Sequence, residues 1–308
     1  MSAAIFIDGG AGTTGLEIRE RLAGRPDIEL IALAEHERKD AGARRRALNE
    51  ADFVILCLPD DAAREAVALI DNDRTRVIDA STAHRVAAGW IYGLPELEPD
   101  QAARIGRAAR VANPGCYPTG FLALVRPLVR AGLLPADAFV TVNATSGYSG
   151  GGKAMIAEYQ DGAASAFRPY ALSLGHKHVA EMARHAGLSR SPVFQPAVAD
   201  VYRGMVVEVP LHLAQCSPGT TVNALRDALA AAYAGGMVVR VAEVRVAAIP
   251  IEADAGSDRM TLHCFADEAA GQVRLVATLD NLGKGAAGAA VQNLNIMAGF
   301  DQTAGLVL

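Results

Sequence analysis

The sequence contains no apolar run long enough to cross a membrane. Its longest runs, such as Phe53 to Leu58, are far shorter than the roughly 20 residues that a transmembrane helix needs. The chain opens directly on a strand pattern, without the charged leader and small-residue cleavage site of a secretory signal. Together these absences predict a cytoplasmic protein with no membrane partner.

An excess of basic residues is also missing. The 29 lysines and arginines are outnumbered by 34 aspartates and glutamates, which gives a net charge of −5. Non-specific nucleic-acid binding needs a basic surface, so this balance argues against a nucleic-acid partner. A basic pocket for a small anionic ligand stays possible.

The cysteines lack any paired spacing. Cys57, Cys116, Cys216 and Cys264 are scattered along the chain, a pattern that fits neither a zinc site nor a disulfide scaffold. We therefore expect no metal. Cys57 lies in an apolar strand pattern and is expected in the core. Cys216 and Cys264 have no turn or helix start beside them, so we interpret both as structural.

The residues that are present indicate a packed chain of two domains, because 308 residues with 51% hydrophobic content exceed one typical domain. Strand and helix patterns alternate in the N-terminal third. Strands are expected at 3–7, 28–35, 52–58 and 75–80, and helices at 40–50 and 60–70. This alternation predicts a doubly wound parallel sheet, which binds ligands at the carboxyl ends of its strands.

A glycine-rich turn follows the first strand. Both Gly10, Gly12, Gly15 and Gly9, Gly12, Gly15 fit a dinucleotide-binding pattern, and the turn opens a helix, as that pattern requires. We expect a cofactor to contact this loop through Gly9, Gly12, Thr13, Thr14 and Gly15.

The coenzyme's phosphate is less clearly indicated. Glu35 lies where an acid would hold the ribose of NAD, whereas Arg38 and Lys39 just beyond it could neutralise the 2′-phosphate of NADP. We expect NADPH to be preferred, with Arg38 mattering more than the run Arg44 to Arg46, which is interpreted as a solvated helix face.

Cys116 stands at the centre of the sequence Asn113-Pro114-Gly115-Cys116-Tyr117-Pro118. The Pro-Gly pair breaks the preceding element, and an apolar helical pattern begins directly after the thiol. A helix start favours the thiolate, so Cys116 is the candidate nucleophile. Pro127 falls inside the pattern, which predicts a kink or an end near Arg126.

Four further residues are candidate substrate contacts. Arg85 follows a strand of the sheet, where it either grips an anion or forms a surface salt bridge. Asn113 precedes the cysteine turn. Ser146 and Gly147 belong to the segment Thr145 to Lys153, which is rich in glycine and hydroxyl groups and is either an anion-binding nest or a surface loop.

From about Phe139 the pattern changes to an α+β domain with longer strands, expected at 139–143, 201–213, 238–249, 260–265 and 273–279. Helices are expected at 179–186 and 221–233, and a last helix at 289–300 should pack on the first domain.

Two histidines, His176 and His178, fall at the start of one of these helices. We favour His176 as the partner of Cys116 because Gly175 could carry it into the cleft, with Glu181 in support. His178 is expected to cap the helix or face solvent.

These segments together resemble one enzyme family. Gly9 to Gly15, Val111 to Gly120, Gly175 to His178 and Asp280 to Gly288 are similar to the N-acetyl-γ-glutamyl-phosphate reductases of arginine biosynthesis, especially their shorter subfamily. The resemblance implies an NADP-binding Rossmann domain at 1–115, completed by a helix at 285–308. It also implies a catalytic and oligomerisation domain with a mixed sheet at 116–284, in a homo-oligomer (dimer or tetramer).

For the site, the resemblance implies that Cys116 attacks an acyl phosphate and forms a thioester, with His176 or His178 as the acid–base. Glu35 departs from the simplest expectation for NADP. Two alternatives remain: a reductase like aspartate-semialdehyde dehydrogenase, and a nucleotide-binding thiol sensor without catalytic activity.

Overall fold

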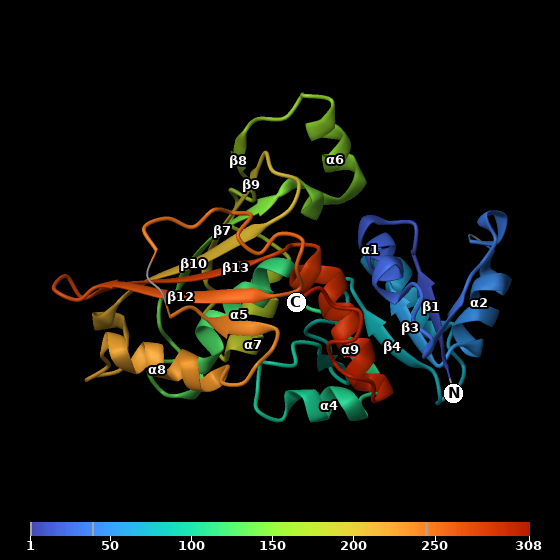
Figure 1. Cartoon of the computed structure of the whole chain (residues 1–308), viewed down its shortest axis with the longest axis horizontal. Coiled ribbons are helices and arrows are strands. Elements are labelled where there is room, and N and C mark those ends of the chain that lie inside the picture. The colour runs from blue at the N-terminus through green and yellow to red at the C-terminus, as the bar shows by residue number, and fades with distance from the viewer. Residues whose placement is uncertain (1, 39, 244–245) are drawn as a thin grey trace. The chain divides into compact units, whose positions relative to one another are not determined.

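The computed structural model describes residues 2–38, 40–243 and 246–308 (Figure 1). Contacts divide the chain into two compact units. The first unit comprises Met1–Pro95, Asp100–Pro114 and Ala286–Leu306, and the second comprises Glu96–Pro99, Gly115–Gly285 and Val307–Leu308. Each unit is described by itself below.

The first unit is built on a parallel sheet, as the alternating pattern predicts. In the described part of the chain its strands follow the order β2-β1-β3-β4-β6-β5, and every neighbouring pair is parallel. Their bounds are β1 (Ala3–Asp8), β2 (Ile28–Ile31), β3 (Phe53–Leu56), β4 (Arg76–Asp79), β5 (Ile91–Tyr92) and β6 (Arg110–Ala112).

Helices cover both faces of this sheet because its buried strands present apolar side chains to both sides. Along β1, Ile5 and Ile7 join one buried cluster and Phe6 joins the other. The first cluster lies under α1 (Thr13–Leu22), α4 (Gln101–Arg107) and α9 (Gly288–Ala298). The second lies under α2 (Ala41–Glu50) and α3 (Asp60–Ala68).

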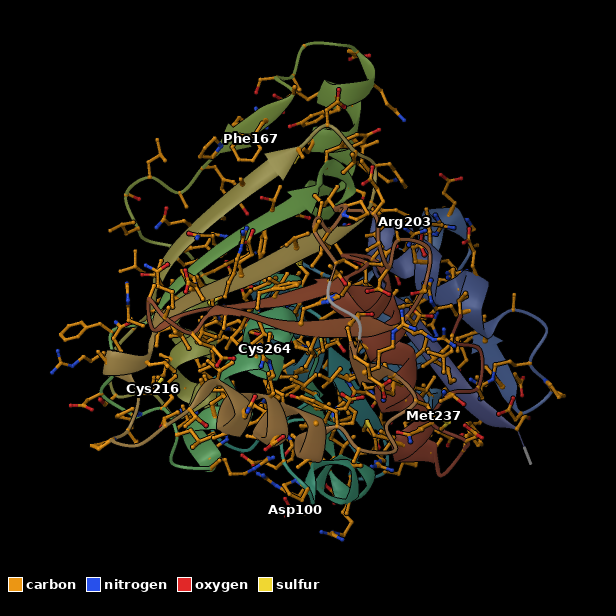
Figure 2. The ribbon with its side chains drawn as sticks, turned by 60° about the vertical axis from the view of Figure 1, so that its left-hand side comes forward. Asp100, Phe167, Arg203, Cys216, Met237 and Cys264 are labelled. Carbon is orange, nitrogen blue, oxygen red and sulfur yellow. The ribbon has the colours of Figure 1, made fainter. Side chains whose placement is uncertain are left out.

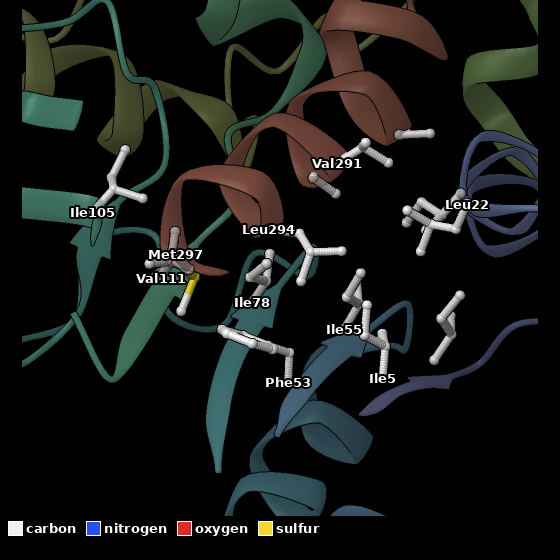
Figure 3. Close-up of a cluster of buried hydrophobic side chains, with 14 of the residues drawn as sticks. Ile5, Leu22, Phe53, Ile55, Ile78, Ile105, Val111, Val291, Leu294 and Met297 are labelled. Carbon is white, nitrogen blue, oxygen red and sulfur yellow. The ribbon is translucent and has the colours of Figure 1, made fainter. Parts of the chain in front are cut away.

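The helix expected at 289–300 is α9, and it packs within this first unit. Its contacts are with α1, α4 and β4. Val291, Leu294 and Met297 of α9 belong to the buried cluster that includes Ile55 and Ile78 of the sheet. Leu294 lies next to Ile78, and Met297 lies next to Val111 (Figure 3). The first unit therefore draws on both ends of the sequence.

The second unit contains a mixed sheet, and the expected two-part α/β fold is confirmed. The order of its described strands is β11-β12-β13-β10-β7-β9-β8, with parallel and antiparallel neighbours. These strands are β7 (Thr141–Gly147), β8 (Phe167–Pro169), β9 (Val193–Ala199), β10 (Met205–His212), β11 (Val239–Val241), β12 (Met260–Asp267) and β13 (Gln272–Leu279). Figure 2 shows Phe167 at the β8 edge.

Helix α5 (Cys116–Arg130) lies against β10, β12 and β13, and it also contacts α7 (His178–Ala186) and α8 (Val222–Ala232). Helix α6 (Gly152–Gln160) follows β7. None of the helices in the described ranges is long and apolar enough to cross a membrane.

Of the kink or end expected near Arg126, the end is wrong, since α5 continues to Arg130, and the kink stays a prediction. Pro127 has no N–H for the carbonyl of Ala123, four residues earlier. The hydroxyl of Tyr233 donates to that carbonyl instead, at 2.7 Å. A partner from outside the helix therefore satisfies the acceptor that the proline leaves open.

Other expected boundaries also differ from the structure. Strand β2 ends at Ile31, and Glu35 lies in a 3₁₀ turn. The strand expected at 201–213 begins at Met205 because residues 201–203 bend. The one expected at 238–249 is described only as Val239–Val241, and part of it, Val244 and Arg245, lies outside the described residues. The sequence patterns missed α4, α6 and β9.

Candidate active site and dinucleotide site

Cys116 is the first residue of α5, at the end where unpaired backbone N–H groups and the helix dipole favour a thiolate. Gly115 precedes it in extended conformation. The N–H of Gly115 donates to Oε1 of Glu181 at 2.8 Å, and the hydroxyl of Thr119 donates to the carbonyl of Gly115 at 2.9 Å. Buried hydrogen bonds thus hold the turn that presents the thiol.

Gly285, near the C-terminal end of the sequence of the second unit, lies close to Cys116. A Cβ atom at residue 285 would lie 2.9 Å from Cβ of Cys116 and 2.9 Å from the carbonyl oxygen of Asp280. No larger residue fits without moving this backbone. Asp280, which is fully buried, shapes the turn by accepting from the N–H groups of Leu282 and Gly283 and by pairing with Arg203 at 2.6 Å.

Aromatic rings and both histidines gather beside the residue that follows the thiol, Tyr117. The ring centroid of Tyr117 lies 6.4 Å from that of His176, 5.9 Å from that of His178 and 5.2 Å from that of Phe194. The Tyr170 hydroxyl donates to the Tyr117 hydroxyl at 3.3 Å, and Tyr117 donates to the carbonyl of Ala197 at 3.1 Å.

The two tyrosines remain protonated at ordinary pH. Burial, with smaller contributions from Tyr170 and Cys116, raises the pKa of Tyr117 well above its usual value. Burial likewise raises the pKa of Tyr170 to about 12, with the hydrogen bond to Tyr117 acting in the opposite direction and the charge of Cys116 adding a smaller increase. The rings therefore form a neutral wall, so an ionised Cys116 has no tyrosinate beside it.

The histidine pair is arranged differently from the expectation. His178 is buried, with 6% of its surface exposed, so the expectation that it faces solvent is wrong. His176 contacts the helix start instead: its Nδ1 accepts from the N–H of His178 at 3.1 Å. Burial, and secondarily the charge of Lys177, lowers the pKa of His176 to about 4. His176 is therefore a neutral imidazole with its proton on Nε2.

Ser146 and Gly147 end β7. Ser146 is near enough to Tyr117 to lower the pKa of its hydroxyl, and the hydroxyl of Ser146 donates to the carbonyl of Gly147 at 2.9 Å. The expected anion nest in this segment is wrong for three of its amides. Those of Gly147, Tyr148 and Ser149 already donate to carbonyls in the segment 201–204. The segment continues as a 3₁₀ turn and then as α6, so it is not an extended surface loop.

In the first unit, the glycine loop connects β1 to α1 with the wider spacing Gly9, Gly12, Gly15. Gly9 has φ +83°, and a Cβ there would lie 2.2 Å from the carbonyl oxygen of Cys57. The N–H of Gly12 donates to the carbonyl of Gly9 at 3.0 Å, and Thr13 and Thr14 open α1. The loop has the compact form that lets a helix N-terminus approach a pyrophosphate.

Beside this loop a pocket is lined by basic and apolar side chains. Arg38 and Arg44 line it from the β2–α2 side, with Asp8, Leu33 and Leu58. Arg44 is not the expected solvated residue, because it pairs with Asp8 at 2.8 Å and its side chain is 13% exposed. Lys39, the other expected contact of the phosphate, lies outside the described residues.

Arg85 is buried in the first unit, so the surface salt bridge is excluded. Its Nε donates to the carbonyl of Asn113 at 3.0 Å and its Nη2 to that of Ala80 at 3.0 Å. Nδ2 of Asn113 donates to Ala286, and Oδ1 of Asn113 accepts from Asn293 of α9 at 3.0 Å. Arg85 and Asn113 thus belong to one buried polar network.

The sequence patterns missed three features of this site. These are Tyr170, the role of Asp280 in forming its turn, and the hydrogen bond from the N–H of Gly115 to Glu181. Only Asp280 carried a signal, as the first residue of a glycine-rich segment. Among the described residues, no group of three or more His, Cys, Asp and Glu side chains could hold a metal ion.

Two family models match the chain. "Semialdehyde dehydrogenase, NAD binding domain" matches residues 4–105, and "Semialdehyde dehydrogenase, dimerisation domain" matches residues 116–281. Aspartate semialdehyde dehydrogenase from Francisella tularensis aligns with a TM-score of 0.74 at 13% identity, over 96% of this chain and 100% of that one. The enzyme from Candida albicans, solved with NADP, gives 0.66 at 15% identity, over 97% and 99%. Fold and family models therefore define the class as semialdehyde dehydrogenase.

More similar sequences narrow this class. The N-acetyl-gamma-glutamyl-phosphate reductase of Rhizobium meliloti is 52% identical over 96% of this chain and 99% of its own length. That of Trichormus variabilis is 50% identical over 98% of both. The chain belongs to the family of N-acetyl-gamma-glutamyl-phosphate reductases.

Proposed function

We propose that this chain reduces N-acetyl-γ-glutamyl phosphate to N-acetyl-glutamate 5-semialdehyde with NADPH and releases phosphate, as a step of arginine biosynthesis. The observation that carries the proposal is Cys116 at the start of α5, with both histidines beside its neighbour Tyr117, in a chain half identical to enzymes of this name.

Cys116 begins the reaction as a thiolate. Its sulfur attacks the acyl carbon, the new C–S bond forms, and the C–O bond to phosphate breaks, which leaves a thioester and free phosphate. NADPH, when bound, supplies the hydride that reduces the acyl group. The oxygen of the reduced acyl group receives the proton that His178 took from the thiol, which gives a thiohemiacetal. In the last step His178 takes this proton back, the C=O bond re-forms, the C–S bond breaks, and Cys116 is restored as a thiolate as the aldehyde departs.

The histidines divide the proton work between them. Nδ1 of His176 accepts a hydrogen bond from the first N–H group of α7, so the proton of the neutral ring is on Nε2. This Nε2–H group is available as a donor. His176 therefore stabilises the oxygen on which negative charge develops. We therefore assign the thiol proton to His178, the other imidazole beside Tyr117. His178 takes this proton from Cys116 and passes it to and from the substrate oxygen in the later steps.

The residues that contact the coenzyme and the substrate are assigned from the segments in which they lie. The coenzyme is bound in the first unit, domain 1–115 with the C-terminal helix, by Gly9, Gly12, Thr13, Thr14, Gly15 and Arg38, and by Lys39. Gly9 and Gly12 form the required tight turn, and the arginine-lined pocket fits an added phosphate. Ser146 and Gly147 are assigned to the substrate, which is reduced in the catalytic domain 116–284. Arg85 and Asn113, the other two contacts expected from the sequence, are not assigned to it, because their polar groups bond within the first unit.

The protein works as a homo-oligomer in the cytoplasm. The name of the family model over residues 116–281 supports an oligomer, either a dimer or a tetramer. Cytoplasmic location agrees with free cysteines at all four positions. Light scattering on the purified chain would establish the oligomer.

The test runs the reaction backwards. Purified protein should reduce NADP⁺ when supplied with N-acetyl-glutamate 5-semialdehyde and phosphate, and omission of phosphate should abolish the rate. Aspartate semialdehyde as sole substrate should be used at least tenfold less well, since it carries a free amine and one methylene fewer. Preference for it would establish the alternative dehydrogenase, and no reduction with either aldehyde would favour a thiol sensor.

A further inference from the structure

Arg19 of α1 lies over the glycine loop, although no sequence motif includes it. A Cβ atom built on Gly10 would lie 2.7 Å from Nε of Arg19 and 3.0 Å from its Nη2. The guanidinium thus lies directly against the loop backbone, where the absence of a side chain on Gly10 makes room for it.

The Nε–H of Arg19 is buried, and no described residue accepts its hydrogen bond. Leaving a charged donor buried and unpaired is costly, and such groups in native proteins usually have a partner. An anionic ligand in the neighbouring pocket is the acceptor that would satisfy it.

Arg19 lines the same pocket as Arg38 and Arg44, so three elements each contribute one guanidinium. Asp8 balances the charge of Arg44 at 2.8 Å. Arg19 and Arg38 therefore leave an excess of positive charge in a pocket whose other walls include the apolar Leu33, Leu58 and Ala62. Cations beside an apolar wall suit a phosphorylated nucleoside.

We propose that Arg19 binds the 2′-phosphate of NADP and helps determine the preference for this coenzyme, an inference that rests on the proposed function. The pocket extends to residues after β2, where a doubly wound sheet holds the adenosine ribose. Guanidinium groups match phosphate oxygens with several donors at once. A pyrophosphate contact is the competing role, and it makes a different prediction.

The experiment measures binding rather than turnover. Adenosine 2′,5′-bisphosphate and adenosine 5′-monophosphate are titrated by calorimetry into the wild type, Arg19→Ala and Arg19→Lys. The control is Arg45→Ala, which removes one positive charge from α2 at an exposed side chain paired with Asp71. Arg19→Ala should weaken the affinity for the bisphosphate roughly tenfold to a hundredfold, as expected for the loss of charged hydrogen bonds. Its affinity for the monophosphate should stay within about twofold of the wild-type value.

Arg19→Lys should fall between the wild type and Arg19→Ala, and Arg45→Ala should match the wild type. Unchanged affinity of Arg19→Ala for the bisphosphate overturns the assignment. An equal loss of affinity for both nucleotides also overturns it, because it would show that Arg19 contacts the 5′-phosphate that both nucleotides carry. If the wild type itself binds neither nucleotide, the NADP-dependent function fails. If it binds both normally while Arg19→Ala has no effect, only the role of Arg19 fails.

Discussion

Cys116 is the residue on which the chemistry depends, and its removal should separate reduction from coenzyme binding. The thiol belongs to the second unit, whereas the glycine loop belongs to the first. We expect Cys116→Ser to lower turnover roughly 10³-fold or more, because a serine hydroxyl ionises far less readily than a thiol and is the weaker nucleophile beside the same histidines. Affinity for NADP, measured by calorimetry, should stay unchanged.

The control for this variant is Cys264→Ser on β12 (Figure 2), which should retain full activity. Normal turnover by Cys116→Ser would falsify the thioester mechanism.

The second prediction concerns His176 and His178. The pH dependence of Cys116 alkylation should distinguish the histidine that stabilises the oxyanion from the one that takes the thiol proton. Since burial lowers the pKa of His176 to about 4, this ring stays neutral from about pH 5 upward. His176→Asn should reduce turnover by roughly 10²- to 10³-fold, as expected for loss of one donor to the developing oxyanion, without moving the pH at which Cys116 is alkylated. His178→Asn should shift that alkylation to higher pH.

Stability supplies an independent measurement on His176. The unfolded chain binds a proton at this residue below about pH 6.5, whereas the folded chain does so only near pH 4. Wild-type stability should therefore fall as pH drops from about 6.5 to 4, and the fall should be smaller in His176→Asn. Alkylation that shifts in His176→Asn alone would restore the role assigned to it by the sequence.

The sequence could indicate the nucleophile and the glycine loop because local context defines both. It could not indicate contacts made over long sequence separations. The Arg44–Asp8 pair spans 36 residues, and the Glu181–Gly115 hydrogen bond spans 66. Three arginines in a row resemble a solvated face, and only folding shows that Arg44 reaches back to the end of β1.

At the scale of elements, α5 shows why a proline is a fallible helix signal. Pro127 leaves the carbonyl of Ala123 without its helical N–H donor, and the hydroxyl of Tyr233, directly after α8, donates to that carbonyl instead. No pattern within residues 116–130 contains that information. The end of β2 was misjudged because apolar residues continue past its last paired residue, and the start of β10 was misjudged because the residues before Met205 bend.

This contact leads to a prediction on stability. Tyr233→Phe should lower the free energy of unfolding by about 1–3 kcal/mol, because it leaves a buried carbonyl without a donor. Adding Pro127→Ala should recover part of the loss, since an alanine at 127 supplies the missing N–H within the helix. Chemical denaturation of the two variants and the wild type measures both effects. Equal stability of Tyr233→Phe and the wild type would show that the hydroxyl contributes nothing.

At the scale of the whole molecule, the alternation of strands and helices made the first sheet predictable, since each parallel strand is a short apolar run. The role of α9 in that unit has an energetic consequence. Leu294 is fully buried against the sheet, so Leu294→Ala should cost about 2–5 kcal/mol.

Trp90, the single tryptophan, lies in the first unit and reports its unfolding by fluorescence. Leu16→Ala, at a side chain of α1 that is 48% exposed, is the control and should change stability by less than about 0.5 kcal/mol. A Leu294→Ala chain as stable as this control would mean that α9 adds little to the unit.

The placement of α9 also determines when the first unit can be completed during translation. The sheet that α9 covers is synthesised early, but α9 emerges more than half a chain later, because residues 115–285 intervene. At about 5–20 residues per second, the apolar face formed by Ile5, Ile55 and Ile78 waits on the order of 10–40 s for this helix. For that interval the nascent chain presents a surface that chaperones recognise, and the unit made first is finished last.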